Sequence, residues 1–223
     1  MALAEALGYD ERIGAAFLRA GVGFGGGCLP KDIRAFVARA EELGVREAVS
    51  FLEQVDAINR RRRDRVVALA ERCLGGSPEG ARVVVLGAAF KPDSDDIRDS
   101  PALEVARRLH ERGARVRVCD PRALDAVRRH HRGLETVREP LAALEDADLV
   151  LLLTEWNEFV RLDPDEAADR VATPVVIDGR NALDARRWRE AGWTHLGLGR
   201  PRLVPALRTR ALRRARSPRK VPR

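Results

Sequence analysis

Apolar positions in the first third of the chain recur with helical spacing. Residues 31–74 predict helix, in two segments broken near Gly44. The second segment, 47–74, keeps its apolar residues about one turn apart, at Val49, Leu52, Val55, Ile58 and Val66. The basic run Arg60–Arg63 lies inside this helix, and we expect it to form a stripe that faces solvent or another subunit.

Beyond the glycine- and proline-containing linker at 75–78, the pattern changes to strands that alternate with helices. The β-branched run Val83–Leu86 is typical of a strand buried on both faces. Further strands are predicted at 116–119, 149–153 and 175–177. One helix should run from the Ser100-Pro101 start to Gly113, and another from the Asp184 cap to near Gly192. Strands separated by helices indicate a doubly wound, mostly parallel sheet.

The pattern divides the chain into three regions. Residues 1–76 form a central helical segment, with a short helical start and a glycine-rich loop. Residues 77–200 form the α/β domain, and residues 201–223 form a basic tail. The fold class is therefore α/β.

Composition and cysteine usage narrow the cellular setting. The 223 residues are 45% hydrophobic, enough for a sizeable core, but no run approaches the roughly 18 apolar residues of a membrane span. The N-terminus lacks the basic start and apolar block of a secretory signal. Three widely spaced cysteines favour reduced thiols over a disulfide framework. These features predict a cytoplasmic protein without a membrane partner.

The net charge of +7 is concentrated at the C-terminal end. Residues 200–223 hold nine Arg, one Lys and no acid, so the remaining residues sum to −3. We expect a disordered, solvated tail. Nucleic-acid binding, or an electrostatic arm for acidic surfaces, would rest on this tail alone, so a nucleic-acid partner is unlikely on this pattern.

The segment Gly23–Asp32 holds the strongest candidate chemistry. Four glycines precede Cys28 and let the backbone approach a ligand closely. Lys31 and the start of the following helix favour a thiolate, and Asp32 is placed to handle a water or a proton. A flexible loop beside an inert cysteine is the plainer interpretation. The combination favours Cys28 as a nucleophile.

Three polar loops each follow a predicted strand: 87–101, 153–159 and 177–181. Ligands of open parallel sheets bind outside the carboxyl ends of the strands, so these loops should converge there. The turn Gly87-Ala88-Ala89-Phe90-Lys91 lacks the Gly-x-Gly-x-x-Gly fingerprint of dinucleotide sites. This sheet is therefore not predicted to be a primary NAD site.

The loop Gly23–Asp32 resembles the active-site loop of the UDP-glucose and GDP-mannose dehydrogenase family, with Gly27 in the place of the usual serine. The three polar loops resemble family blocks in the same order, and the resemblance extends to about Pro201. It implies a Rossmann-like UDP-binding domain over 77–200. It also implies an NAD-binding domain upstream of residue 1, so the chain would be a fragment or its NAD-binding half would be encoded separately.

The resemblance further implies oxidation of UDP-glucose to UDP-glucuronate with two NAD, held mainly by the missing N-terminal domain. Cys28 would form a thiohemiacetal and then a thioester, Asp32 would help to activate water, and Lys31 would support the local electrostatics. We expect no appreciable turnover by the chain alone.

The resemblance also implies binding roles. The substrate-binding candidates are Arg12, Phe17, Leu18, Arg19, Phe24, Gly25, Phe90, Lys91 and Arg180. Arg12 would reach the nucleotide sugar across a subunit interface, and Arg98 would reach the cofactor. Helix 47–74 resembles the helix through which the family dimerises, so a homodimer is expected, although the same periodicity would suit a spacer. No metal site is predicted.

Two alternatives stay open. One is a stand-alone UDP-sugar-binding or regulatory module with a vestigial cysteine, which the intact Gly23–Asp32 loop disfavours. The other is a fragment of a UDP-N-acetylhexosamine or GDP-mannose dehydrogenase. The blocks Lys91–Asp96 and Thr154–Trp156 look more like those of UDP-glucose enzymes.

Overall fold

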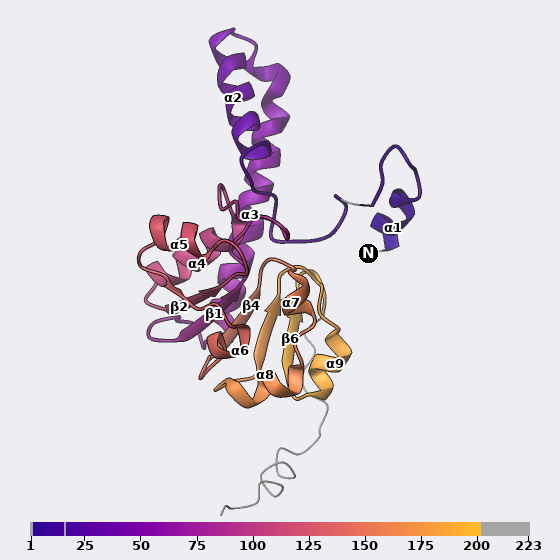
Figure 1. The fold of residues 1–223 in the computed structure, drawn as a ribbon. Coiled ribbons are helices and arrows are strands. Elements are labelled where there is room, and N and C mark those ends of the chain that lie inside the picture. The colour runs from indigo at the N-terminus through magenta and orange to yellow at the C-terminus, as the bar shows by residue number, and fades with distance from the viewer. Residues whose placement is uncertain (1, 16, 202–223) are drawn as a thin grey trace, which may run out of the picture.

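The structure is a computed structural model that describes residues 2–15 and 17–201 (Figure 1). The predictions for the basic tail, which concern its order and its binding of nucleic acid, fall on residues beyond 201 and lie outside the described residues.

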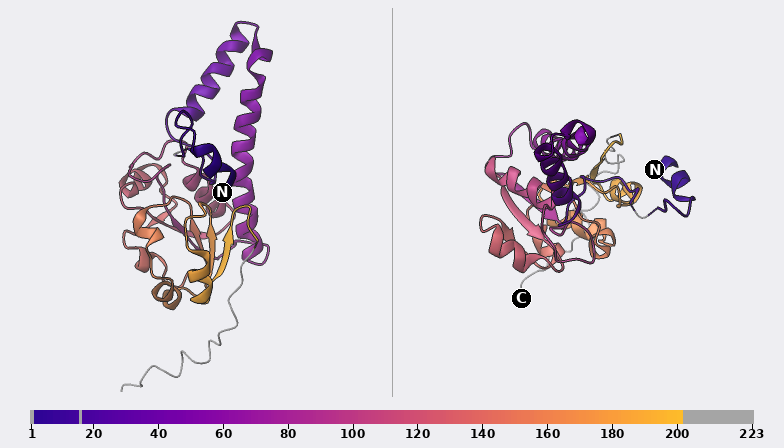
Figure 2. Two further views of the ribbon diagram at one scale, coloured as in Figure 1. Left: turned by 90° about the vertical axis from the view of Figure 1, so that its right-hand side faces the viewer. Right: turned by 90° about the horizontal axis from the view of Figure 1, so that it is seen from above.

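The N-terminal region is helical, as the apolar spacing predicted. A short helix α1 (Ala2–Gly8) precedes the glycine-rich loop, and α2 (Leu29–Glu42) follows it. The predicted break near Gly44 is confirmed: Gly44 has a φ of +73°, and a 3₁₀ turn η1 (Arg46–Val49) leads into α3 (Ser50–Cys73). Helices α2 and α3 form a hairpin that projects from the α/β domain (Figures 1 and 2).

The two halves of α3 have different surroundings. Towards its C-terminal end Val66, Val67 and Ala70 are buried, and α3 contacts α4 (Pro101–Glu111) of the α/β domain. In the projecting half, Phe51 and Ile58 are at least half exposed. The prediction that the whole Arg60–Arg63 run faces solvent or a subunit is wrong for Arg63, which is 7% exposed and pairs with Glu104. Arg63 lies on the face that meets α4, whereas Arg60, Arg61 and Arg62 are exposed.

Six parallel strands form one sheet in the order β3-β2-β1-β4-β5-β6. The strands are β1 (Arg82–Leu86), β2 (Arg115–Cys119), β3 (Glu135–Thr136), β4 (Leu149–Leu152), β5 (Val175–Asp178) and β6 (Thr194–Gly197). The predicted α/β class with a doubly wound, parallel sheet is confirmed. β3 and β6 were not predicted, because β3 has only two residues and β6 lacks a β-branched run.

The predicted helix starts at 100 and 184 are confirmed. The Ser100 hydroxyl accepts a hydrogen bond from the Leu103 amide, and the Asp184 carboxylate accepts from the amides of Arg186 and Arg187. The second of these caps begins α9 (Ala185–Glu190). The remaining helices are short and were not predicted: α5 (Leu124–His130), α6 (Pro140–Ala143), α7 (Asn157–Val160) and α8 (Pro164–Arg170).

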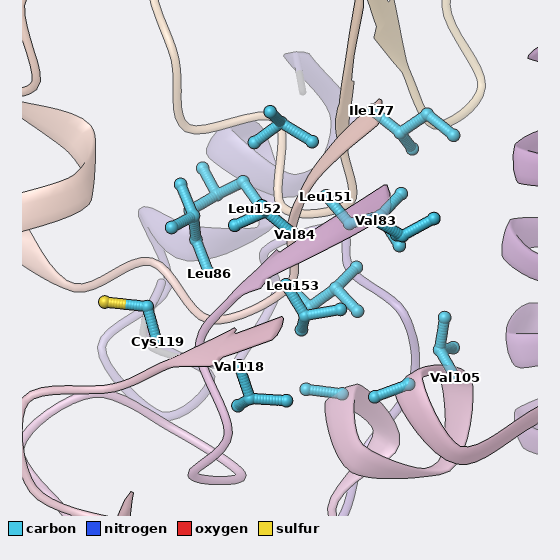
Figure 3. Close-up of a cluster of buried hydrophobic side chains, with 14 of the residues drawn as sticks. Val83, Val84, Leu86, Val105, Val118, Cys119, Leu151, Leu152, Leu153 and Ile177 are labelled. Atoms are coloured by element: carbon cyan, nitrogen blue, oxygen red, sulfur yellow. The ribbon is translucent and has the colours of Figure 1, made fainter. Parts of the chain in front are cut away.

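The core lies around the two middle strands (Figure 3). Val83, Val84 and Leu151 are fully buried, as a strand covered on both faces requires. The sheet grows outward from β1 in one direction and from β4 in the other, and in sheets of this kind the ligand crevice lies where these two neighbours end. The loops that follow β1 and β4 flank it. Among the described residues, no helix is both long and apolar enough to span a membrane.

Candidate functional site

The three polar loops predicted to converge do meet at the carboxyl end of the sheet. The Thr154 hydroxyl, after β4, donates to the Ala89 carbonyl oxygen, after β1, over 2.7 Å. Arg180, after β5, forms an ion pair of 2.6 Å with Glu155. Both partners of this ion pair are largely buried, so the guanidinium is held in one place at the crevice.

A buried carboxylate that sequence reasoning missed fixes two of these loops. Asp120 follows β2 directly and is fully buried. One oxygen accepts hydrogen bonds from the amides of Ala88 and Ala89 and from the Trp156 indole, and the other accepts from the amides of Arg122 and Ala123. The sequence feature that could have identified Asp120 is its place as an acidic residue directly after the predicted strand 116–119.

Asp178, at the end of β5, is a second buried carboxylate and sets the backbone of the 179–183 turn. It accepts from the amides of Arg180 and Leu183, and His195 lies 3.5 Å away. Burial acts to raise the pKa of Asp178, but the hydrogen bonds from His195 and the loop amides outweigh it, so this pKa lies below its ordinary value. The ionised carboxylate therefore holds the turn that carries Arg180.

The glycine-rich loop packs against these turns through positions where a side chain would not fit. Gly21 lies against the guanidinium of Arg180. The Gly26 amide donates to the Arg98 carbonyl oxygen over 2.9 Å. A β-carbon at Gly25 would overlap the Asp99 carbonyl oxygen, and one at Gly27 would overlap the Arg98 guanidinium. The loop can lie this close to residues 98–99 only because it lacks these side chains.

Cys28 stands at the N-cap of α2, directly after the close contact at Gly27. The cysteine is exposed, and its carbonyl oxygen accepts the first helical hydrogen bond, from Asp32. Lys31 and Asp32 are both exposed and pair with each other over 3.1 Å.

Arg98 is the cation beside Cys28. Its pKa is raised mainly by its hydrogen bond to Asp96, and attraction from Cys28 contributes. Its side chain is 73% exposed and lies over Gly27, where a larger residue would displace it. The thiol at the mouth of the site therefore has a guanidinium neighbour that can stabilise a thiolate.

The three cysteines differ sharply in environment. Burial raises the pKa of the Cys119 thiol to about 12, and this thiol donates to the Arg138 carbonyl oxygen (Figure 3). Cys73 is half-buried and Cys28 is exposed. Because alkylation requires the thiolate, we expect iodoacetamide to modify native Cys119 at least about 10³-fold more slowly than Cys28 near neutral pH. Peptide mass spectrometry over a time course measures both rates, and comparable rates would contradict the prediction.

The structure brings some of the predicted site residues together. Phe24, Gly25, Cys28, Phe90, Arg98 and Arg180 form one continuous group around the glycine loop, with Phe90 against Gly26. Lys91 extends this group, since its ammonium lies 5.6 Å from the centre of the Phe90 ring.

The predicted substrate residues nearer the N-terminus lie on the segment that precedes the glycine loop. Arg12 is exposed and pairs with Asp10, and Phe17 is 97% exposed. Leu18 is half-buried and Arg19 is exposed. Helix α1, just before them, stands apart from the α/β domain (Figure 2). Within the described residues, no group of three or more side chains is suited to holding a metal ion.

Two stretches of the sequence match models of the same family. Residues 1–61 match the central domain of the UDP-glucose/GDP-mannose dehydrogenase family, and residues 84–185 match its UDP-binding domain. The chain belongs to the UDP-glucose/GDP-mannose dehydrogenase family. The family resemblance predicted from the Gly23–Asp32 loop is thus confirmed. The stretch that matches the family's UDP-binding domain lies within the α/β domain.

Curated and solved members of the family cover most of this chain. It is 38% identical to a UDP-glucose 6-dehydrogenase of Rhizobium meliloti over 89% of its length and 37% identical to one of Pseudomonas aeruginosa over 88%. It is 41% identical to the solved UDP-glucose dehydrogenase of Pyrobaculum islandicum, with a TM-score of 0.72 over 83% of this chain and 41% of the other. The chain spans 45% and 44% of the length of the two curated relatives.

Proposed function

We propose that this chain is the substrate-binding part of a nucleotide-sugar 6-dehydrogenase that oxidises UDP-glucose to UDP-glucuronate, with Cys28 as the nucleophile. The observation that carries the proposal is the placement of Cys28, which lies on a loop packed against Arg98 on one turn and Arg180 on another. A cysteine on a loop that contacts two arginines of a UDP-binding domain suits an anionic nucleotide sugar.

Arg180 and Lys91 would bind the diphosphate. A guanidinium donates in a planar fork that fits phosphate oxygens, and Glu155 already orients that of Arg180. Phe24, Gly25 and Phe90 would line the sugar and uridine. In this proposal Arg12 reaches the nucleotide sugar of a second subunit, and Phe17, Leu18 and Arg19 line the sugar and diphosphate.

The described residues do not suit the main part of NAD. In dinucleotide-binding folds, the amides of the turn after the first strand face the pyrophosphate. Here the amides of Ala88 and Ala89 donate to the Asp120 carboxylate instead. NAD would therefore be held by another domain, in the same longer chain or in a separate one, and only the exposed Arg98 offers it a contact from this side.

The covalent chemistry falls to Cys28. Its thiolate would add to the carbonyl carbon of the C6 aldehyde, and the oxygen takes up a proton, which gives a thiohemiacetal. Loss of a hydride from that carbon and of the hydroxyl proton leaves a thioester. Water then adds to the thioester carbon and displaces the Cys28 sulfur, so the thiol is regenerated and the acid is released. Asp32 would accept the proton of that water. The oxidation of the C6 alcohol to the aldehyde and the oxidation of the thiohemiacetal to the thioester each need one NAD as hydride acceptor.

A homodimer through α3 is the second part of the proposal. The α2–α3 hairpin exposes Phe36, Phe51 and Ile58 by at least half. A separate groove of about 580 Å³ between the two helices is lined by Ile33, Val37 and Ala57 together with charged residues such as Arg34 and Glu53. Apolar side chains grouped on a projecting hairpin favour a protein partner, and a second copy of the chain would bury them. Sedimentation velocity tests this, since a monomer throughout the micromolar range would contradict it.

Two alternatives are distinguished by binding and chemistry. A stand-alone UDP-sugar-binding module would bind UDP-glucose but leave Cys28 without function. Other nucleotide sugars are the second alternative, since a solved UDP-D-ManNAc dehydrogenase of Pyrococcus horikoshii is 25% identical to this chain. The higher identity to UDP-glucose enzymes favours UDP-glucose.

Calorimetry of the purified chain with UDP-glucose, and with GDP-mannose as control, tests the proposed substrate. We expect UDP-glucose to bind at least about tenfold more tightly than GDP-mannose, and we expect no appreciable NAD reduction by the chain alone. Preference for GDP-mannose would contradict the assignment. NAD reduction at ordinary enzyme rates would show that the chain alone suffices.

Substitution Arg180→Met should raise the dissociation constant of UDP-glucose by about 10- to 100-fold. The loss of a charge-assisted hydrogen bond costs about 1.5–3 kcal/mol, and the unpaired Glu155 would repel the diphosphate. The matched control is Arg186→Met, which removes a largely exposed arginine that also pairs with an acid. Equal affinities of the two variants in calorimetry would contradict the role of Arg180.

A further inference from the structure

Asn59 of α3 binds both backbone polar groups of Phe24, in the glycine loop. The Phe24 amide donates to the Asn59 side-chain oxygen over 2.8 Å, and the Asn59 side-chain nitrogen donates to the Phe24 carbonyl oxygen over 2.9 Å. Asn59 is 3% exposed, so water does not compete strongly for these bonds. Both polar groups of one residue in the loop are thereby fixed to the helix.

Arg63, one turn further along α3, joins the same carbonyl to the α/β domain. Its guanidinium donates to the Phe24 carbonyl oxygen over 3.1 Å and pairs with Glu104 on α4. The side chain is 7% exposed. Three segments distant in sequence therefore meet at this guanidinium: the glycine loop, the helical hairpin and the α/β domain.

The other side of the loop is fixed as well. Two residues beyond Phe24, the Gly26 amide donates to the Arg98 carbonyl oxygen, and Gly27 lies under the Arg98 side chain. Gly23 has a φ of +106°, and a β-carbon there would overlap the Asn59 side-chain oxygen. The loop thus runs between α3 and residue 98 immediately before it delivers Cys28.

We propose that Asn59 and Arg63 are positioning residues, which hold the glycine loop so that Cys28 and the backbone at 24–25 face the substrate. The proposal rests on the proposed function for what Cys28 and Phe24 do there. The hold on the loop itself does not depend on it. Neither side chain needs to contact the substrate, since both act through the Phe24 backbone.

Hydrogen–deuterium exchange of the full chain tests the hold on the loop. Asn59→Leu keeps a similar volume and removes both hydrogen bonds, so peptides that cover 22–28 should exchange at least about tenfold faster. Asn59→Asp keeps an acceptor for the Phe24 amide and should restore most of the protection. The matched control is Asp64→Asn, which breaks another α3–α4 ion pair, with Arg108, and does not touch the loop.

UDP-glucose affinity is the second readout. Asn59→Leu should weaken binding by about tenfold, and Asp64→Asn should leave it unchanged. If Asn59→Leu does not fold, Arg63→Lys replaces it as the test. This variant keeps the charge near Glu104 and should give an intermediate loss of affinity. Unchanged loop exchange in Asn59→Leu, or an equal change in Asp64→Asn, would overturn the proposal. If the unsubstituted chain binds no UDP-glucose, the substrate assignment fails, and the exchange data alone decide the positioning role.

Discussion

Cys28→Ser is expected to lower kcat by at least about 10³-fold in a chain completed with an NAD-binding domain from a relative. A serine hydroxyl at the N-cap of α2 would remain protonated near neutral pH, so it would add slowly to the aldehyde and would form no thioester. The first oxidation does not need the sulfur, but net production of the acid does. The rate of UDP-glucuronate formation in the steady state measures the loss.

Binding should be almost unaffected by the same change. The sulfur and the hydroxyl are similar in size and Cys28 is exposed, so the affinity for UDP-glucose should stay within about threefold. Cys73→Ser, at the far end of α3, is the matched control and should keep its turnover. A kcat within about tenfold of the unsubstituted enzyme would rule out Cys28 as the nucleophile.

Asp120→Ala should destabilise the α/β domain by about 4 kcal/mol or more. The change strands four backbone amides and the Trp156 indole in a fully buried place, and each buried donor without a partner costs about 1–3 kcal/mol. Because domains are stable by only about 5–15 kcal/mol, the variant should be near its folding limit.

Urea unfolding followed by circular dichroism measures this loss. The matched control is Asp125→Ala, which removes an aspartate that is 71% exposed on the adjacent α5 and should change stability by no more than about 0.5 kcal/mol. A loss below about 1 kcal/mol in Asp120→Ala would mean that water or a local shift replaces the carboxylate, and that Asp120 does not organise the loops.

Local chemistry allowed much of the fold to be predicted. Continuous apolar runs marked β1 and β4, and Ser100 and Asp184 marked helix starts through their capping side chains. β3 and β6 and the four-residue helices α6 and α7 could not be found in the same way. Elements this short are stabilised by their neighbours in the sheet, and their own residues carry little periodic signal.

The residues of the candidate site also divide into those that the sequence allowed us to predict and those that it did not. The glycines, Cys28 and the loops after the strands were identifiable because each performs its role within a short stretch of chain. Asp120 and Asn59 were not, since their roles depend on amides that lie about 30 residues or more away in sequence. Arg63 was misjudged for the same reason: helical spacing does not say which arginine of a basic run meets α4. The role of Arg12 across a subunit interface and the role of Phe17 at the sugar stay predictions.

Protection of Cys28 from alkylation by UDP-glucose tests the central claim most directly, because it requires both a formed nucleotide-sugar site and a cysteine within it. The purified chain would be treated with iodoacetamide with and without UDP-glucose, and the modification of each cysteine followed by mass spectrometry, with Cys73 as internal reference. The proposed site predicts that UDP-glucose slows the reaction of Cys28 at least about tenfold and leaves Cys73 unchanged, while GDP-mannose does little. If calorimetry shows UDP-glucose bound but Cys28 reacts at its original rate, the cysteine lies outside the occupied site, and the proposed mechanism is wrong.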